Sequence, residues 1–210
     1  RSRGLGDVYK RQGYARNPEL VINFYNERRK QLLDVVPNAG HLGVADLERD
    51  FNVTVVTQNV DNLHERAGST HVIHLHGELT KVCSSRDPYN PHFVKELAPE
   101  EYEVKLGDKA GDGTQLRPFI VWFGESVPEI ETAIRYVEQA DIFVIIGTSL
   151  NVYPAAGLLN YVPRAAEVYL IDPKPVDTHV MRPIHVIQKG ASEGVKELKA
   201  LLTATQPPLP

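Results

Sequence analysis

The stretch IFVIIGTS, residues 142–149, decides the fold of this chain. Its first five residues are apolar and mostly β-branched, which predicts a short strand buried on both faces. Residues 51–57 and 168–171 have the same character, and residues 127–139 and 153–161, which lie between these runs, have helical periodicity. Strands that alternate with helices form parallel βαβ units. We therefore expect an α/β fold with a Rossmann-like, doubly wound parallel sheet.

The rest of the chain adds further helices and one irregular region. Apolar residues at one-face spacing predict a helix over residues 18–36, and residues 184–187 and 192–202 predict a last strand and a last helix. Residues 81–117 show no sustained period, so we expect a small irregular or helical module there. Residues 203–210 are rich in proline and should form a flexible tail.

Length and composition exclude several classes of protein. The 210 residues, 42% of them hydrophobic, are enough for a full core. The sequence has no long apolar window and no signal peptide, so we expect a cytoplasmic protein with no membrane partner. A net charge of -4 gives no basic footprint for nucleic acid. The single cysteine, Cys83, excludes an intramolecular disulfide and a zinc site built from paired cysteines.

The first twelve residues differ from the rest of the chain. They are strongly basic and have no apolar period. DVYKRQ, residues 7–12, is the translation of GATGTGTATAAGAGACAG, the transposon end used to prepare sequencing libraries. We therefore expect residues 1–12 to be a non-native leader that precedes a gene fragment.

Two polar segments directly follow predicted strands. TQNVD at residues 57–61 and GTS at residues 147–149 lie at the carboxyl ends of strands, where α/β sheets bind ligands. Asn59 both donates and accepts hydrogen bonds, and Asp61 accepts them, so the pair can recognise a carboxamide such as that of nicotinamide. The same two side chains are equally suited to cap a helix or to form a turn.

Three histidines, His71, His74 and His76, follow the first of these segments. His74 and His76 would point to one side of an extended segment, which is compatible with a metal site. Histidines also end strands with one nitrogen bonded to the main chain. Because Gly77 allows the main chain to approach a ligand closely, we favour His76 as a base that works near neutral pH and expect no metal.

Five motifs, in order, resemble the sirtuin family of NAD-dependent protein-lysine deacylases. They are TQNVDNLH (57–64), HLHGE (74–78), VWFGE (121–125), GTSL (147–150) and VYPAA (152–156). The resemblance is closest to the bacterial branch related to the succinyl-lysine deacylases. It implies a sirtuin catalytic domain over residues 13–202, with a small module from about residues 13–40 and 81–117 and a Rossmann-like remainder.

The resemblance also implies roles for individual residues. His76 would be the general base that acts on the ribose hydroxyls of NAD, which is consumed as a co-substrate. The implied cofactor-binding residues are Gln58, Asn59, Asp61, His76, Gly147, Thr148, Ser149, Asp172 and Ala191. The implied substrate-binding residues are Tyr25, Arg28, Val121, Trp122, Phe123, Gly124, Glu125 and Val152, and residues 121–125 would pair with the backbone of an acyl-lysine protein or peptide.

The acyl preference depends on Tyr25 and Arg28. In the predicted helix they share a face, and Arg28 lies between Phe24 and Leu32 on the apolar stripe, where an unpaired charge is costly. Arg28 can also extend its charge to solvent or pair with an acid of the chain. The Tyr-x-x-Arg pair is similar to the one that marks sirtuins accepting acidic acyl groups, which implies removal of succinyl and malonyl as well as acetyl groups.

Two departures from the family pattern affect these expectations. No Gly-Ala-Gly-x-Ser loop is present before Gly13, so we expect an amino-terminal truncation that removes the pyrophosphate cradle and impairs this fragment. Most sirtuins also bind zinc through two cysteine pairs in the region of residues 82–116, where this chain has only Cys83, so we expect no zinc. The alternatives are a noncatalytic module that binds ADP-ribose, NAD or an acyl-peptide, if the chain is complete as given, and, more distantly, a redox dehydrogenase.

Overall fold

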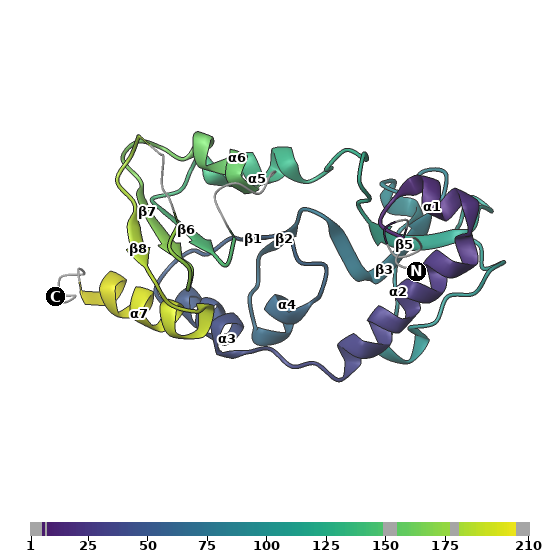
Figure 1. Cartoon of the computed structure of the whole chain (residues 1–210), viewed down its shortest axis with the longest axis horizontal. Helices are drawn as coiled ribbons and strands as arrows, with labels where there is room; N and C mark the ends of the chain where they lie inside the picture. The colour runs from purple at the N-terminus through teal and green to yellow at the C-terminus, as the bar shows by residue number, and fades with distance from the viewer. Residues whose placement is uncertain (1–5, 7, 149–154, 177–180, 205–210) are drawn as a thin grey trace. The chain divides into compact units, whose positions relative to one another are not determined.

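The computed structural model describes residues 6, 8–148, 155–176 and 181–204. Within these ranges the chain forms two compact units (Figure 1). Unit 1 comprises Arg1–Val36, Thr57–Asn62 and His74–Pro128, and unit 2 comprises Pro37–Val56, Leu63–Ile73 and Glu129–Pro210. Strands β1 (Val55–Thr57) and β2 (Val72–His74) pair in a two-stranded sheet where the chain passes from unit 2 to unit 1.

Unit 1 is built on one long helix and an antiparallel sheet. Its elements are α1 (Arg11–Arg16), α2 (Pro18–Leu33), β3 (Gly77–Ser84), η3 (Pro91–Phe93), β4 (Lys95–Glu96), η4 (Pro99–Glu101) and β5 (Leu116–Ile120). The strand order is β4-β3-β5, and β3 is antiparallel to both neighbours. Asn17 begins α2 by accepting a hydrogen bond from the amide of Leu20 at 3.1 Å, with Pro18 in the first turn.

Apolar residues of α2 hold this helix against the sheet. Val21 and Tyr25 belong to a buried cluster with Leu79 and Trp122. One residue further along the helix, Ile22 belongs to a second cluster, completed by Val82 and Val104. The predicted helix over residues 18–36 is confirmed, although it ends at Leu33.

The sheet of unit 1 corrects the expectation for residues 81–117. We predicted an irregular or helical module there, but β3 continues to Ser84, β4 lies within the region, and β5 begins at Leu116. The register of β3 against β5 shifts between Gly77 and Val82. A bulge of this kind interrupts the two-residue alternation by which a strand is recognised in sequence.

Unit 2 contains the parallel sheet. Its elements are α3 (Ala39–Asp46), η2 (Leu47–Arg49), α4 (Leu63–Ala67), α5 (Ile130–Val137), β6 (Ile142–Ile146), α6 (Ala155–Leu158), η5 (Leu159–Tyr161), β7 (Glu167–Ile171), β8 (His185–Ile187) and α7 (Ala191–Ala204). β7 is parallel to both β6 and β8. Ile146 pairs with Ile171, which pairs with Ile187, so the three strands end level at one edge of the sheet.

The central strand β7 is buried on both of its faces, as its sequence predicts. Tyr169 and Ile171 belong to a core cluster that also includes apolar residues of α7 and α3. Val168 and Leu170 alternate with them and are equally buried. In Figure 1, α5 and α6 are drawn on one side of the three strands and α7 on the other. This is the doubly covered parallel sheet that we expected for the fold.

Element ends differ from the predictions by a few residues. The strand predicted over residues 51–57 is confined to β1, although Phe51 and Val53 still pack against the core. The helix predicted over residues 127–139 is the shorter α5, and the helix predicted over residues 153–161 is confirmed from Ala155, since residues 153–154 lie outside the described ranges. Within the described residues, no helix is long and apolar enough to span a bilayer.

The close contact between α7 and β7 generates a stability prediction. A Cβ added at Gly194 would overlap Cγ2 of Ile171, which is fully buried and has no room to move. Gly194→Ala should therefore lower the free energy of unfolding by about 1–3 kcal/mol, measured by urea denaturation. Gly190→Ala is the matched control, because a Cβ there meets nothing within 4 Å. Equal stability of the two variants would contradict the packing of α7 on β7.

Candidate active site

The loop after β1 is held by hydrogen bonds between its main chain and two side chains. The amide of Asn59 donates to Oγ1 of Thr57 at 3.0 Å, and Nδ1 of His74 lies 2.9 Å from the carbonyl oxygen of Asn59. The side chain of Asn59 is exposed, and those of Gln58 and Asp61 are half-buried. The main chain of Asn59, not its side chain, makes these hydrogen bonds, and the residue is exposed.

One buried atom of this loop lacks a partner among the residues that the structure describes. Oδ1 of Asn62 makes no hydrogen bond to the described chain, although it is shielded from solvent. A buried amide oxygen without a donor is costly and is normally satisfied by water or a ligand. The loop therefore offers an acceptor that suits a carboxamide N–H group.

His76 lies between β2 and β3, where two contacts hold its main chain. Its carbonyl oxygen accepts a hydrogen bond from the amide of Val121 at 2.9 Å. Gly77 has a φ of +84°, and a Cβ there would overlap the carbonyl oxygen of Phe119, so only glycine allows β5 to come this close. The imidazole is half-buried, and this burial lowers the pKa of His76 below its usual value. His76 is consequently neutral, and able to accept a proton, at neutral pH.

The other two histidines have structural partners. In unit 2, Nδ1 of His71 lies 2.9 Å from Oγ1 of Thr54, and its ring packs edge-on against Tyr136 at 4.6 Å between centroids. In unit 1, His74 contacts the main chain of the loop after β1. The strand-end alternative therefore describes His74 well.

Residues 121–125 form a tight turn after β5. Gly124 has a φ of +87°, and the amide of Glu125 donates to the carbonyl oxygen of Trp122 at 2.9 Å. Trp122 is buried, whereas Phe123 is 76% exposed. The amide of Phe123 donates to the carbonyl oxygen of Tyr9 at 3.0 Å. One main-chain donor of this segment is thus already paired with an extended part of the chain.

A buried ion pair between Arg117 and Glu125 stabilises the turn at residues 121–125. Both Nη atoms of Arg117 donate to the Glu125 carboxylate, at 2.9 and 3.0 Å, and the guanidinium lies 3.7 Å from the centre of the Trp122 ring. Oε2 of Glu125 also accepts from the Trp122 amide at 3.0 Å and from the Tyr89 hydroxyl at 3.1 Å. Burial alone would raise the pKa of Glu125, but these donors hold it below its usual value.

Arg117 and Tyr89 were missed in the sequence. The signal for Arg117 was one charge inside the apolar run LRPFIVW, residues 116–122. A lone charge in a buried strand requires a partner, and Glu125 was available eight residues later. No comparable pattern marked Tyr89.

The structure changes the interpretation of the acyl pair on α2. Tyr25 is buried, and its hydroxyl accepts from Nε1 of Trp122 at 3.1 Å and donates to the Val8 carbonyl at 3.4 Å. Burial raises the pKa of Tyr25 to about 12. Arg28 is exposed, contacts Gln31 and lies 5.0 Å from the centre of the Phe24 ring.

We predicted that Arg28 would lie on the buried stripe of α2, and this was wrong. The buried arginine is the next residue, Arg29, which donates to the carbonyl oxygens of Tyr102 and Leu79 and to the side chain of Asn26. Burial lowers the pKa of Arg29 to about 10. One helical position corresponds to 100°, so neighbouring arginines have opposite environments.

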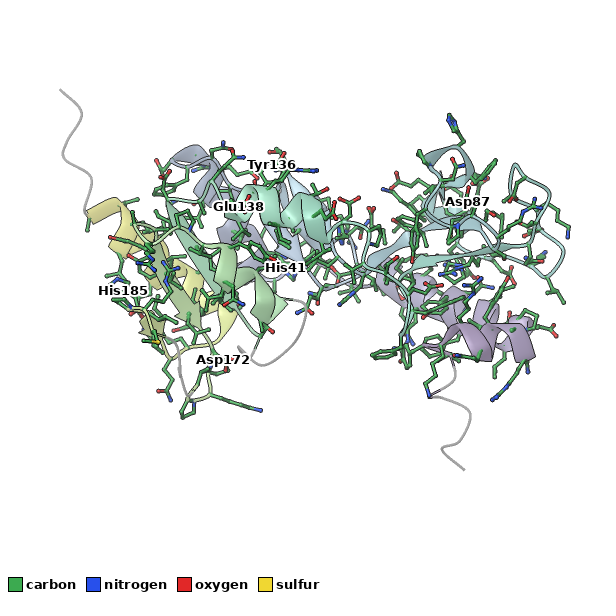
Figure 2. All side chains as sticks on the ribbon, turned by 90° about the horizontal axis from the view of Figure 1, so that it is seen from above. His41, Asp87, Tyr136, Glu138, Asp172 and His185 are labelled. Carbon is green, nitrogen blue, oxygen red and sulfur yellow. The ribbon has the colours of Figure 1, made fainter. Side chains whose placement is uncertain are left out.

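In unit 2, the predicted cofactor residues follow the level ends of the parallel strands. Gly147, directly after β6, has a φ of +63°, and its amide donates to the carbonyl oxygen of Ile171 at 3.0 Å. Asp172, labelled in Figure 2, follows β7, and its Oδ1 accepts from the Lys174 amide at 2.8 Å. Gly147 and Asp172 therefore both lie at the carboxyl edge of the sheet, each directly after its strand.

Four other predicted residues complete this account. Thr148 is half-buried after Gly147, and Ala191 is the first residue of α7. The predicted Ser149 and Val152 lie outside the described residues.

The end of β3 is joined to residues 108–115 by a polar network. Oγ of Ser84 donates to Oδ2 of Asp112 at 2.7 Å, and Asp112 Oδ1 accepts from the amide and hydroxyl of Thr114 at 3.1 and 2.7 Å. The hydrogen bonds from Ser84 and Thr114 lower the pKa of Asp112 to about 2. The contribution of these hydrogen bonds to the stability of the fold is fully present above the ordinary carboxyl pKa near 3.8 and is lost as the pH falls towards 2. Cys83, beside Ser84, is fully buried, and burial raises its pKa to about 12.

Polar loops at the level ends of parallel strands are typical of nucleotide-binding α/β proteins. The Sir2 family profile matches residues 3–154. A relative from Bacteroides thetaiotaomicron, named an NAD-dependent protein deacylase, is 82% identical over 191 residues, which are 91% of this chain and 82% of that protein. A Helicobacter pylori protein of the same name is 46% identical over 192 residues, 91% of this chain and 81% of its own. The chain belongs to the Sir2 family.

Solved structures agree with this assignment. A Sir2 homologue in complex with NAD has a TM-score of 0.78 and 35% identity, covering 95% of this chain and 78% of that one. A complex of Sir2 with a p53 peptide and NAD+ has a TM-score of 0.74 and 26% identity, covering 94% of this chain and 83% of that one.

The Ser84–Asp112 network predicts that unit 1 folds without zinc. A single buried thiol cannot provide the four ligands of a structural zinc site, whereas hydrogen bonds already join the two segments. Treatment with a strong chelator should leave the melting temperature unchanged, and Cys83→Ser should cost less than about 1.5 kcal/mol because its partner, the carbonyl of Pro118, remains. Zinc found at one equivalent by elemental analysis, and lost together with stability, would contradict this.

Proposed function

We propose that this protein removes acyl groups from protein lysines and consumes NAD in the reaction. Its relatives in Bacteroides and Helicobacter are named NAD-dependent protein deacylases. The observation that carries the proposal is His76, a half-buried imidazole whose pKa is lowered by burial, held between two strands in the sirtuin motif HLHGE. A base with these properties is the chemical requirement for activating a ribose hydroxyl.

The residues present suit NAD. The unpartnered oxygen of Asn62 and the exposed amide of Asn59 fit the nicotinamide carboxamide, which both donates and accepts. Asp172 fits the ribose hydroxyls, which donate to a carboxylate. We assign NAD binding to Gln58, Asn59, Asp61, His76, Gly147, Thr148, Ser149, Asp172 and Ala191.

When it is bound, NAD supplies a ribose carbon that loses nicotinamide and accepts the acyl oxygen. In the proposed mechanism, a ring nitrogen of His76 accepts the proton of a ribose hydroxyl, and burial keeps that nitrogen unprotonated at neutral pH. The Val121 amide holds the His76 main chain in place through this step.

Residues 121–125 supply the main-chain groups for an extended acyl-peptide in this proposal. The p53 peptide complex shows that a solved relative binds a peptide. The parallel bridge between Lys10 and Phe123 supports the assignment, because the Phe123 amide there donates to another main-chain segment. A peptide strand that pairs at Phe123 has to replace the Tyr9 carbonyl.

Acidic acyl groups are the finer part of the proposal. Arg28 is exposed and its guanidinium lies over Phe24, so it is accessible to a carboxylate of a succinyl or malonyl group. The Tyr25 hydroxyl lies three residues earlier on the helix and is oriented by Trp122. It can turn to the same carboxylate when Val8 is displaced.

Substitution of His76 tests the catalytic assignment. His76→Tyr should reduce nicotinamide release from NAD and an acyl-peptide by at least about 100-fold, because a general base contributes that much or more. His92→Tyr, at an exposed histidine of unit 1, is the control. In the parent protein, activity should fall only below pH 6.5, since burial lowers the His76 pKa.

A His76 variant with turnover within a few fold of the parent would reject the assignment. If the parent itself bound ADP-ribose but released no nicotinamide, the noncatalytic binding module would be the better description.

Substitution of Arg28 tests the acyl preference. Arg28→Met should raise the KM for succinyl-lysine peptides about 10-fold while changing that for acetyl-lysine peptides less than twofold, because only the former carry a carboxylate. Lys30→Met removes an exposed charge from the same helix and serves as the control. Equal effects of Arg28→Met on both peptides would contradict a role in acyl recognition.

A further inference from the structure

Unit 1 contains a pocket that none of the roles above explains. Its volume is about 400 Å³, and its lining includes Arg11, Arg86, Tyr89, Phe123, Gly124 and Ser126. Phe123 and Gly124 belong to the segment that we assign to substrate pairing, and Ser126 directly follows it. The pocket therefore lies at the end of that segment.

The wall formed by Tyr89 and Glu125 is rigid. The Tyr89 hydroxyl donates to Oε2 of Glu125, whose carboxylate is held by Arg117. The Phe119 ring packs edge-on against Tyr89 at 6.4 Å between centroids. A pocket with such a wall does not need to be ordered by its ligand, which lowers the entropic cost of binding.

The charge in the pocket is positive. Three arginines and one carboxylate line it, and the carboxylate of Glu125 already neutralises Arg117. Of the other two arginines, Arg11 lies in the expected leader and Arg86 belongs to the rest of the chain, and both are exposed. Arg86 is tethered, since its Nη2 atom lies 3.1 Å from the Asp112 carbonyl oxygen and 3.5 Å from its carboxylate, yet the side chain is 69% exposed.

Asp112 is not part of the pocket lining, and its carboxylate pairs with Arg86 at 3.5 Å. Its two oxygens accept shorter hydrogen bonds from Ser84 and Thr114, and its side chain is 8% exposed. The guanidinium of Arg86 thus has a fixed position and solvent access, which suits a carboxylate that arrives from outside.

We propose that this pocket binds an acidic side chain of the substrate, so that peptides with aspartate or glutamate near the acyl-lysine are preferred. The inference rests on the proposed deacylase function, because the pocket continues the peptide-pairing segment. Arg86 is the main determinant, and the apolar faces of Phe123 and Tyr89 hold the methylene groups of the acidic residue. No chemistry takes place in the pocket.

The test uses pairs of acyl-lysine peptides that differ only by Glu or Gln at one position. Each position on either side of the acyl-lysine is scanned in turn. At the position that reaches the pocket, Glu should lower KM about threefold to fivefold relative to Gln, with kcat unchanged. The advantage should shrink at high salt, since exposed charges are screened.

Arg86→Gln should abolish the advantage of Glu over Gln, and Arg86→Lys should restore part of it. Lys109→Gln, which removes an exposed charge of unit 1 that does not line the pocket, should leave the Glu to Gln ratio unchanged. Equal KM values for Glu and Gln peptides at every position, or a preference that persists in Arg86→Gln, would overturn the inference.

Binding without turnover separates this inference from the proposed function. Fluorescence anisotropy of the same labelled peptides, without NAD, should give a tighter Kd for the Glu peptide with the parent protein and equal Kd values with Arg86→Gln. If nicotinamide is released but acid dependence is absent from both assays, the pocket assignment fails and the deacylase stands. If no peptide supports nicotinamide release, the deacylase fails, while anisotropy still decides whether the pocket binds acidic side chains.

Discussion

The structure of unit 1 depends on the ion pair between Arg117 and Glu125. Two buried charges are expensive to remove from water, and their attraction offsets this only when geometry and further hydrogen bonds are good. Here the carboxylate accepts from Arg117, Trp122 and Tyr89, and the guanidinium lies on the Trp122 ring. Loss of one partner would leave the other charged and unpaired, at about 3–5 kcal/mol.

The same pair connects elements that are far apart in the sequence. Glu125 lies after β5, and Tyr89 follows β3. Trp122 extends the connection through its indole N–H to Tyr25 on α2. The helix that carries the proposed acyl-recognition residues and the turn that carries the proposed peptide-binding groups are thus parts of one hydrogen-bonded body.

The parallel sheet could be predicted from sequence because its signal is local. β6 and β7 are short apolar runs, and each is followed by a turn residue or a carboxylate at the point where the strand ends. The antiparallel sheet of unit 1 could not be predicted from sequence. β3 contains a register shift, and it pairs with β5, from which it is separated by the residues between 84 and 116. Pairing at that separation is set by tertiary contacts that no short window reports.

In the candidate site, too, some residues could be predicted from the sequence and others could not. His76 was identifiable because a motif and a following glycine specify its surroundings, and the structure places it between strands with Gly77 against β5. The environment of Arg28 could not be predicted from the sequence. The apolar stripe of α2 is irregular, and a shift of one residue along the helix places Arg29, not Arg28, on the buried face. Ion pairs such as Arg117 with Glu125 depend on a turn whose shape follows from Gly124.

The pairing of Tyr9 with Phe123 has a consequence for measured affinities. In the proposed function a peptide pairs with residues 121–125, so the segment at Tyr9 is a competitor of fixed local concentration, and the peptide binds only the fraction of molecules in which that segment has detached. The apparent dissociation constant equals the intrinsic one divided by that fraction. Because Val8 is buried when the segment is attached, detachment exposes apolar surface to water. In this proposal, peptide affinity is therefore linked to the same hydrophobic forces that stabilise the fold.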